Sequence, residues 1–67
     1  MSVVKIIKII GQSPDSFDEA VKSAVETTTK TVRNVKSFRV DEMSGEVGDD
    51  GKVEKYRVSL EIAFVIE

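Results

Sequence analysis

Few residues of this sequence could carry out chemistry, because it contains neither cysteine nor histidine. The missing cysteines exclude disulfides and thiol catalysis, and the two absences together exclude any ordinary structural zinc site. The missing histidines also remove the commonest general base. The side chains left for chemistry are carboxylates and one notable arginine, Arg57, which interrupts a mostly apolar segment.

The carboxylates of Asp41, Glu42 and Glu61 could form a pair for general acid–base catalysis. However, charged residues on the open face of a sheet need no such role, and the sequence offers no partner nucleophile. We therefore expect that the protein is not an enzyme.

A second acidic group, formed by Glu46, Asp49 and Asp50, could hold calcium. It lacks the regularly spaced ligands and the terminal glutamate of a calcium-binding loop. The segment Gly48-Asp49-Asp50-Gly51 is also a strong turn signal, because Asp-Gly accepts positive φ angles. We favour a plain hairpin turn over a specific ion site.

Arg57 has two interpretations. A guanidinium in this position could hold an anionic ligand. It could also form an ion pair across neighbouring strands or between subunits. We favour the ion pair and keep the ligand contact as the alternative.

Composition limits the class of protein. The 67 residues allow one domain, 1–67, and a chain this short usually needs disulfides, a metal or partner subunits for stability. Oligomerisation is the remaining option, so we expect a homo-oligomer. The net charge of −2 provides no basic footprint for nucleic acid. The longest apolar run is interrupted by Lys5 and Lys8, which argues against a membrane span or signal segment. We expect a cytoplasmic protein.

The first half of the chain predicts a strand followed by a helix. Residues 3–10 are mostly β-branched and apolar on both faces, and Gly11 is expected to end the strand. Ser16 is the preferred N-cap, forming a capping box with Glu19, and Ser13 is the alternative. Asn34 is the expected C-terminal stop. The apolar stripe of the helix comprises Phe17, Ala20, Val21, Ala24, Val25, Thr28 and Val32.

The second half predicts a β-hairpin from strands at residues 35–47 and 53–66. In the last strand, the face that contains Val58 and Leu60 should pack on the helix. Strict alternation in the middle strand gives two faces. One comprises Val35, Ser37, Arg39, Asp41 and Met43, and the other comprises Lys36, Phe38, Val40 and Glu42. The fold class is therefore α+β, in the order β-α-β-β.

These features together resemble the dodecin family over nearly the whole chain. The resemblance depends on the element order and on three segments, which are residues 4–14 (VKIIKIIGQSP), 16–21 (SFDEAV) and 56–64 (YRVSLEIAF). It implies a three-stranded antiparallel sheet wrapped around one amphipathic helix. It also implies twelve copies assembled into a hollow sphere. Flavin-binding members hold riboflavin, FMN or FAD between subunits, for storage and for quenching of flavin photochemistry.

The resemblance also implies where a flavin would bind. In the family a tryptophan stacks on the flavin ring and a glutamine hydrogen-bonds its polar edge. Their places fall at Ser37 and Arg57, and this sequence has no tryptophan. Because serine offers no aromatic face, we expect weak flavin binding. Phe38 cannot simply substitute unless the register of the strand shifts, since adjacent strand residues face opposite sides.

If the resemblance holds, Ser37 and Arg57 share a pocket between subunits, in which Arg57 could favour phosphate-bearing FMN over riboflavin. The alternative is a flavin-free shell that binds calcium, another cation or an anionic small molecule, with a structural or buffering role.

Overall fold

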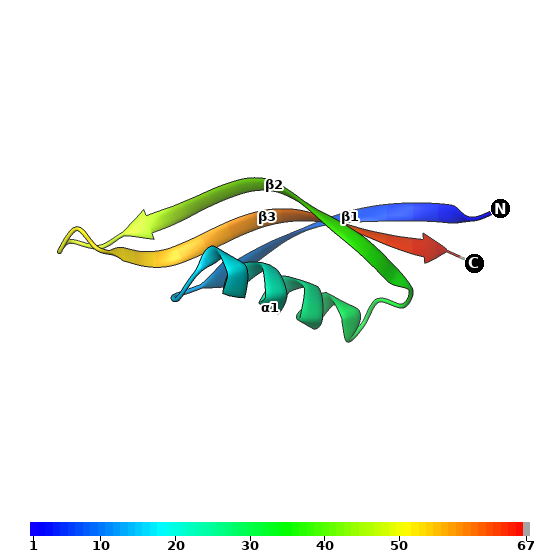
Figure 1. Cartoon of the computed structure of the whole chain (residues 1–67), viewed down its shortest axis with the longest axis horizontal. Coiled ribbons are helices and arrows are strands. Elements are labelled where there is room, and N and C mark those ends of the chain that lie inside the picture. The colour runs from blue at the N-terminus through cyan, green and yellow to red at the C-terminus, as the bar shows by residue number, and fades with distance from the viewer. Residues whose placement is uncertain (67) are drawn as a thin grey trace.

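A computed structural model describes residues 1–66 and contains one helix and three strands. The elements are β1 (Val3–Ser13), α1 (Phe17–Thr29), β2 (Val35–Val47) and β3 (Val53–Ile66). The sheet order is β1-β3-β2, and β3 pairs antiparallel with both neighbours (Figure 1). The predicted α+β class and the β-α-β-β order are confirmed.

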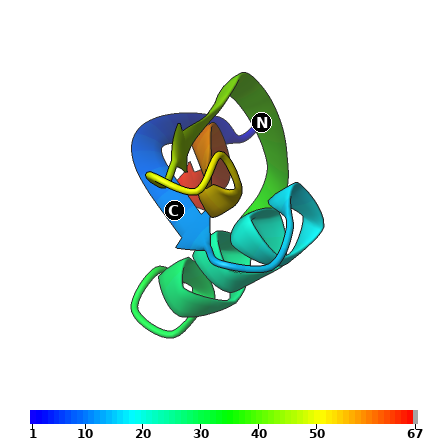
Figure 2. The same cartoon turned by 90° about the vertical axis from the view of Figure 1, so that its left-hand side faces the viewer.

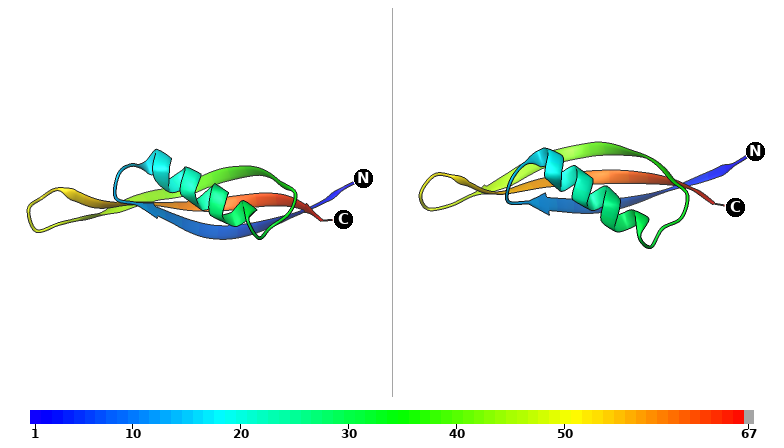
Figure 3. Two further views of the ribbon diagram at one scale, coloured as in Figure 1. Left: turned by 90° about the horizontal axis from the view of Figure 1, so that it is seen from below. Right: turned by 60° about the horizontal axis from the view of Figure 1, so that its bottom comes forward.

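The helix covers only one face of the sheet. Figures 2 and 3 show α1 running obliquely across the strands on that face, while the tip of the β2–β3 hairpin projects beyond it. The molecule measures 53 × 20 × 13 Å, and its radius of gyration is 13.9 Å. A compact chain of this length would have a radius of gyration of about 11 Å. The fold is therefore elongated, and most of the opposite face, called here the outer face, is not covered by the chain itself.

The hydrophobic core lies between β3 and α1. Its fully buried large side chains are Val58, Leu60 and Ile62 of the central strand, and they pack against Ala20 and Ala24 of the helix. The predicted assignment of Val58 and Leu60 to the helix-facing side is confirmed. Two of the five core residues are alanines, so this core is small.

Gly11 has a different role from the one expected. It does not end β1, which continues to Ser13. A Cβ at Gly11 would lie 2.4 Å from the carbonyl oxygen of Ala20 and 2.8 Å from Cβ of Ala24. The glycine therefore lets the helix approach the strand closely, and the expected strand end at this position was wrong.

The helix begins as predicted and ends earlier. The hydroxyl of Ser16 accepts a hydrogen bond of 3.0 Å from the backbone N–H of Glu19, which confirms Ser16 as the N-cap. The helix ends at Thr29, so the expected stop at Asn34 was wrong. Asn34 instead adopts a φ of 61° just before β2 begins. Threonines in the last turns weaken the helix, which explains the early end.

The predicted faces of β2 were wrong in part, because register shifts interrupt its alternation. Between Val40 and Glu42 the strand contains an extra residue relative to β3. Such a bulge moves every later residue to the other face. Met43 therefore lies opposite Val58 on the helix side, and Glu42 lies opposite Ser59 on the outer face. A second shift, after Val35, leaves Val35 packed against the core.

The hairpin turn is formed as predicted. The backbone N–H of Gly51 donates to the carbonyl of Gly48 over 2.9 Å, and Gly51 has a φ of 81°. A carboxylate oxygen of Asp50 accepts a bond of 3.0 Å from the backbone N–H of Lys52. The hydrogen bonds and the positive φ of the turn thus explain why Asp50 and Gly51 occur here, and no bound calcium ion is needed to explain them.

Candidate functional site

The outer face of the sheet brings together side chains from all three strands. Gln12, Arg57 and Ser44 lie side by side in register on β1, β3 and β2. The next row towards the middle of the sheet consists of Ile10, Ser59 and Glu42. A hollow of about 170 Å³ opens here, and it is lined by Ile10, Glu42, Ser44, Arg57 and Ser59.

Arg57 is held in place by two neighbours. Its Nε and Nη2 atoms donate to the side-chain oxygen of Gln12 over 3.2 and 3.1 Å. Nη2 also donates to a carboxylate oxygen of Glu46, with which Arg57 forms an ion pair. The predicted cross-strand ion pair of Arg57 is confirmed. Glu46 was expected to belong to the acidic turn, and neither Gln12 nor Glu46 was predicted as a partner of Arg57; the register of the three strands is the signal that would have suggested both.

The charges around this hollow balance one another. Glu46 also lies 3.9 Å from the Nζ atom of Lys55. Two carboxylates, Glu42 and Glu46, therefore accompany two cations, Lys55 and Arg57. The side chains of Arg57 and Glu46 are 33% and 50% exposed, so water reaches the pair. The arrangement can donate hydrogen bonds to a ligand but presents no net positive charge.

A second polar group lies further along the outer face. Arg39 donates to Glu61 over 2.7 Å and forms an ion pair of 3.2 Å with Asp41. The hydrogen bond to Glu61, together with the charges of Glu61 and Asp41, raises the pKa of Arg39 above its ordinary value. Two of the carboxylates that could have served in acid–base chemistry are therefore engaged with a permanent cation.

Ser37 lies on the outer face as well, but far from Arg57. It is in register with Ala63, whereas Arg57 lies six residues earlier on β3. At about 3.3 Å per residue, the two positions are roughly 20 Å apart along the strand. Ser37 also does not line the hollow beside Arg57. One chain therefore places the two predicted ligand contacts on a common face but in separate locations.

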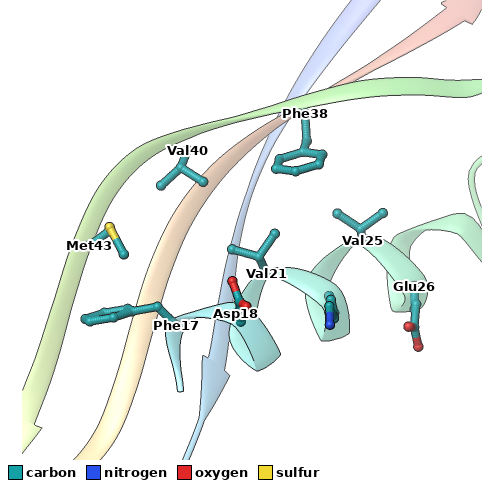
Figure 4. Close-up of a pocket in the computed structure, with 9 residues that line it drawn as sticks. Phe17, Asp18, Val21, Val25, Glu26, Phe38, Val40 and Met43 are labelled. Carbon is teal, nitrogen blue, oxygen red and sulfur yellow. The ribbon is translucent and has the colours of Figure 1, made fainter. Parts of the chain in front are cut away.

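An apolar groove of about 610 Å³ runs between α1 and β2. Figure 4 shows Phe38 and Val40 of β2 directed towards Val21 and Val25 of α1. Phe38 thus lies on the opposite face from Ser37, which confirms that it cannot take the place of a stacking residue there. Phe38 nevertheless remains 50% exposed, because this part of β2 stands away from the helix.

Residues 1–66 contain neither a cluster of metal-binding side chains nor a membrane-spanning helix. No group of three or more acidic side chains there is arranged to hold a metal ion. Within the same residues, no helix has the length and apolar character needed to cross a lipid bilayer.

Comparisons with known proteins agree with this architecture. The sequence model of the family Dodecin matches residues 3–67. A calcium dodecin from Mycobacterium tuberculosis is 41% identical over 64 residues, which cover 96% of this chain and 89% of the relative. Its crystal structure, described as that of a calcium-chelating antigen, superposes with a TM-score of 0.85 at 38% identity, covering 98% of this chain and 93% of that one.

A second relative is a dodecin from Thermus thermophilus. It is 34% identical over 65 residues, which cover 97% of this chain and 93% of the relative. A crystal structure of this dodecin, with a tryptophan replaced by phenylalanine, has a TM-score of 0.93 at 33% identity, covering 100% of this chain and 98% of that one. That relative therefore has a tryptophan, whereas this chain has none.

The fold and the site define a small-ligand-binding protein built on one helix and a three-stranded sheet. The chain belongs to the dodecin family, as the resemblance in its sequence indicated.

Proposed function

We propose that this dodecin is a homododecameric shell that binds and stores a small ligand at contacts between its subunits, without turning it over. The proposal places the shell in the cytoplasm. The family ligand, flavin, binds weakly. The observation that carries the proposal is the row of uncovered apolar side chains that β1 presents on the outer face. On β1, Val4 and Ile6 are each 55% exposed and Ile10 is 63% exposed.

Surface area supports an oligomer. A compact monomer of 7.4 kDa would expose about 4,200 Å². This chain exposes 5024 Å², which is an excess of roughly 800 Å². A standard protein interface buries about 800 Å² on each partner. Since the exposed surface includes the apolar side chains of β1, covering them with other copies would stabilise a chain whose own core is small.

If Ser37 and Arg57 contact one ligand, their positions require a site shared by two copies. Because one chain separates them by roughly 20 Å, a single small ligand could contact both only where the outer faces of two subunits meet. Ser37 offers neither an aromatic ring nor much apolar area. Stacking of a nucleic-acid base on an aromatic side chain is worth about 1–3 kcal/mol. We expect weak flavin binding because a comparable stacking contact is lost here.

The alternative function is a flavin-free shell that binds calcium, and one observation favours it. The relative at 41% identity is a calcium dodecin. Within residues 1–66, no group of three acidic side chains is arranged to hold a metal ion. A calcium site in this protein would therefore need carbonyl or water oxygens beside its carboxylates, or carboxylates from a second subunit.

Three measurements on the purified protein test these proposals. Light scattering should give about twelve times the chain mass of 7.4 kDa. A monodisperse monomer would refute the shell.

Quenching of riboflavin fluorescence should show weak binding, and tight binding would show that Ser37 is not a lost contact. Calorimetric titration with calcium in flavin-free buffer tests the alternative. A saturable heat would favour calcium, and its absence would eliminate that function.

A further inference from the structure

We propose that Glu46 and Gln12 determine which ligands the hollow beside Arg57 accepts. By engaging the guanidinium they favour neutral ligands that carry carbonyl acceptors over ligands that carry phosphate. The inference relies on the proposed function only in placing a ligand at this hollow.

The hydrogen bonds of Arg57 carry the argument. A guanidinium has five N–H donors, and Arg57 uses Nε and Nη2 for Gln12 and Glu46. Within residues 1–66, no acceptor is bonded to Nη1. Arginine binds phosphate best through two parallel N–H donors in a fork. Gln12 and Glu46 engage three of the five N–H groups, and Glu46 occupies part of the fork. The two N–H groups of Nη1 remain; they diverge and can donate to acceptors such as a ring carbonyl, but they do not form a parallel fork with a second nitrogen.

The two carboxylates beside the hollow act in the same direction. Glu46 neutralises Arg57 and lies near Lys55, while Glu42 lines the hollow itself. A phosphate would have to displace Glu46 and would also be repelled by Glu42. This expectation differs from the preference for FMN that the sequence alone suggested, because an isolated arginine would attract phosphate and a paired one does not.

The test is Glu46→Gln, which keeps the size of the side chain and removes its charge. Glu26→Gln is the matched control, because Glu26 is an exposed residue of α1, on the other side of the sheet. Pyrophosphate is titrated into wild type and both variants by calorimetry. Riboflavin and FMN are titrated by fluorescence. Circular dichroism and light scattering verify folding and assembly, and Glu46→Ala serves as the second variant if Glu46→Gln is unstable.

Glu46→Gln should bind pyrophosphate at least about threefold more tightly than wild type, as expected for removal of a partly exposed charge. The gain should shrink at high salt. The affinity ratio of FMN to riboflavin should rise by a similar factor, and Glu26→Gln should change neither. Equal pyrophosphate binding by wild type and Glu46→Gln would overturn the inference. If no flavin binds to any form, the flavin function fails, while the pyrophosphate titration still decides the role of Glu46.

Discussion

Replacing Gly11 with alanine should destabilise the protein, although alanine is normally the better residue for an ordered chain. The new Cβ would meet the backbone carbonyl of Ala20 at 2.4 Å and the Cβ of Ala24 at 2.8 Å. Carbon atoms in contact prefer about 3.5–4.0 Å. Neither neighbour can rotate away, because one is backbone and the other is a methyl group attached to it. The helix would have to move outward by about 1 Å.

The magnitude follows from two opposing effects. Overpacking in a core costs about 1–3 kcal/mol. Alanine also reduces the conformational freedom of the unfolded chain, which stabilises the folded protein by about 0.4–1 kcal/mol. Packing therefore dominates, and we expect a net loss of about 1–2 kcal/mol. A domain of this size loses about 4–8 °C in melting temperature for each kcal/mol.

Thermal denaturation followed by circular dichroism provides the assay, with all proteins at one concentration because assembly also contributes to stability. Gly48→Ala is the matched control. The three atoms nearest to a Cβ at Gly48 all belong to the side chain of Glu54, which is flexible and can swing into solvent. Gly48→Ala should therefore melt within a few degrees of wild type. If Gly11→Ala melts at or above wild type, the close approach of helix and strand does not require a glycine, and the argument fails.

Three further predictions follow from the core, the helix cap and the ligand contacts. Leu60→Asp should prevent folding and assembly, because its side chain is 0% exposed and an unpaired buried carboxylate costs several kcal/mol; a normal circular dichroism spectrum and oligomer mass would contradict this. Ser16→Ala should lower the free energy of unfolding by about 1 kcal/mol in urea titrations through loss of the cap, whereas the exposed Ser23→Ala should not destabilise. The double change Ser37→Trp with Arg57→Gln should raise riboflavin affinity at least about tenfold, which requires about 1.4 kcal/mol. If an assembled double variant shows no gain in fluorescence quenching, these positions do not contact the ligand.

The sequence by itself determined the elements and most of their faces. Alternation in residues 53–66 identified Val58 and Leu60 as core residues, because side chains in a strand repeat every two positions wherever pairing is regular. The N-cap at Ser16 was equally readable, since a cap depends on residues only three positions apart. The backbone N–H of Ser16, which a capping box would direct to Glu19, donates to the hydroxyl of Ser13 instead. The apolar character of both faces of β1 also indicated that one chain could not cover its own surface.

The tertiary structure decided what depends on residues far apart in the sequence. Strict alternation placed Met43 on the wrong face, because a bulge is defined by the partner strand and leaves little trace in local composition. Gly11 was read as a strand end, and only the position of α1 shows that it makes room for Ala20. The hydrogen-bond partners of Arg57 were also set by the tertiary structure. Gln12 and Glu46 lie 45 and 11 residues away in the chain. Pairing of three strands brings them together, so the sheet register, rather than any sequence motif, sets the chemistry of the hollow.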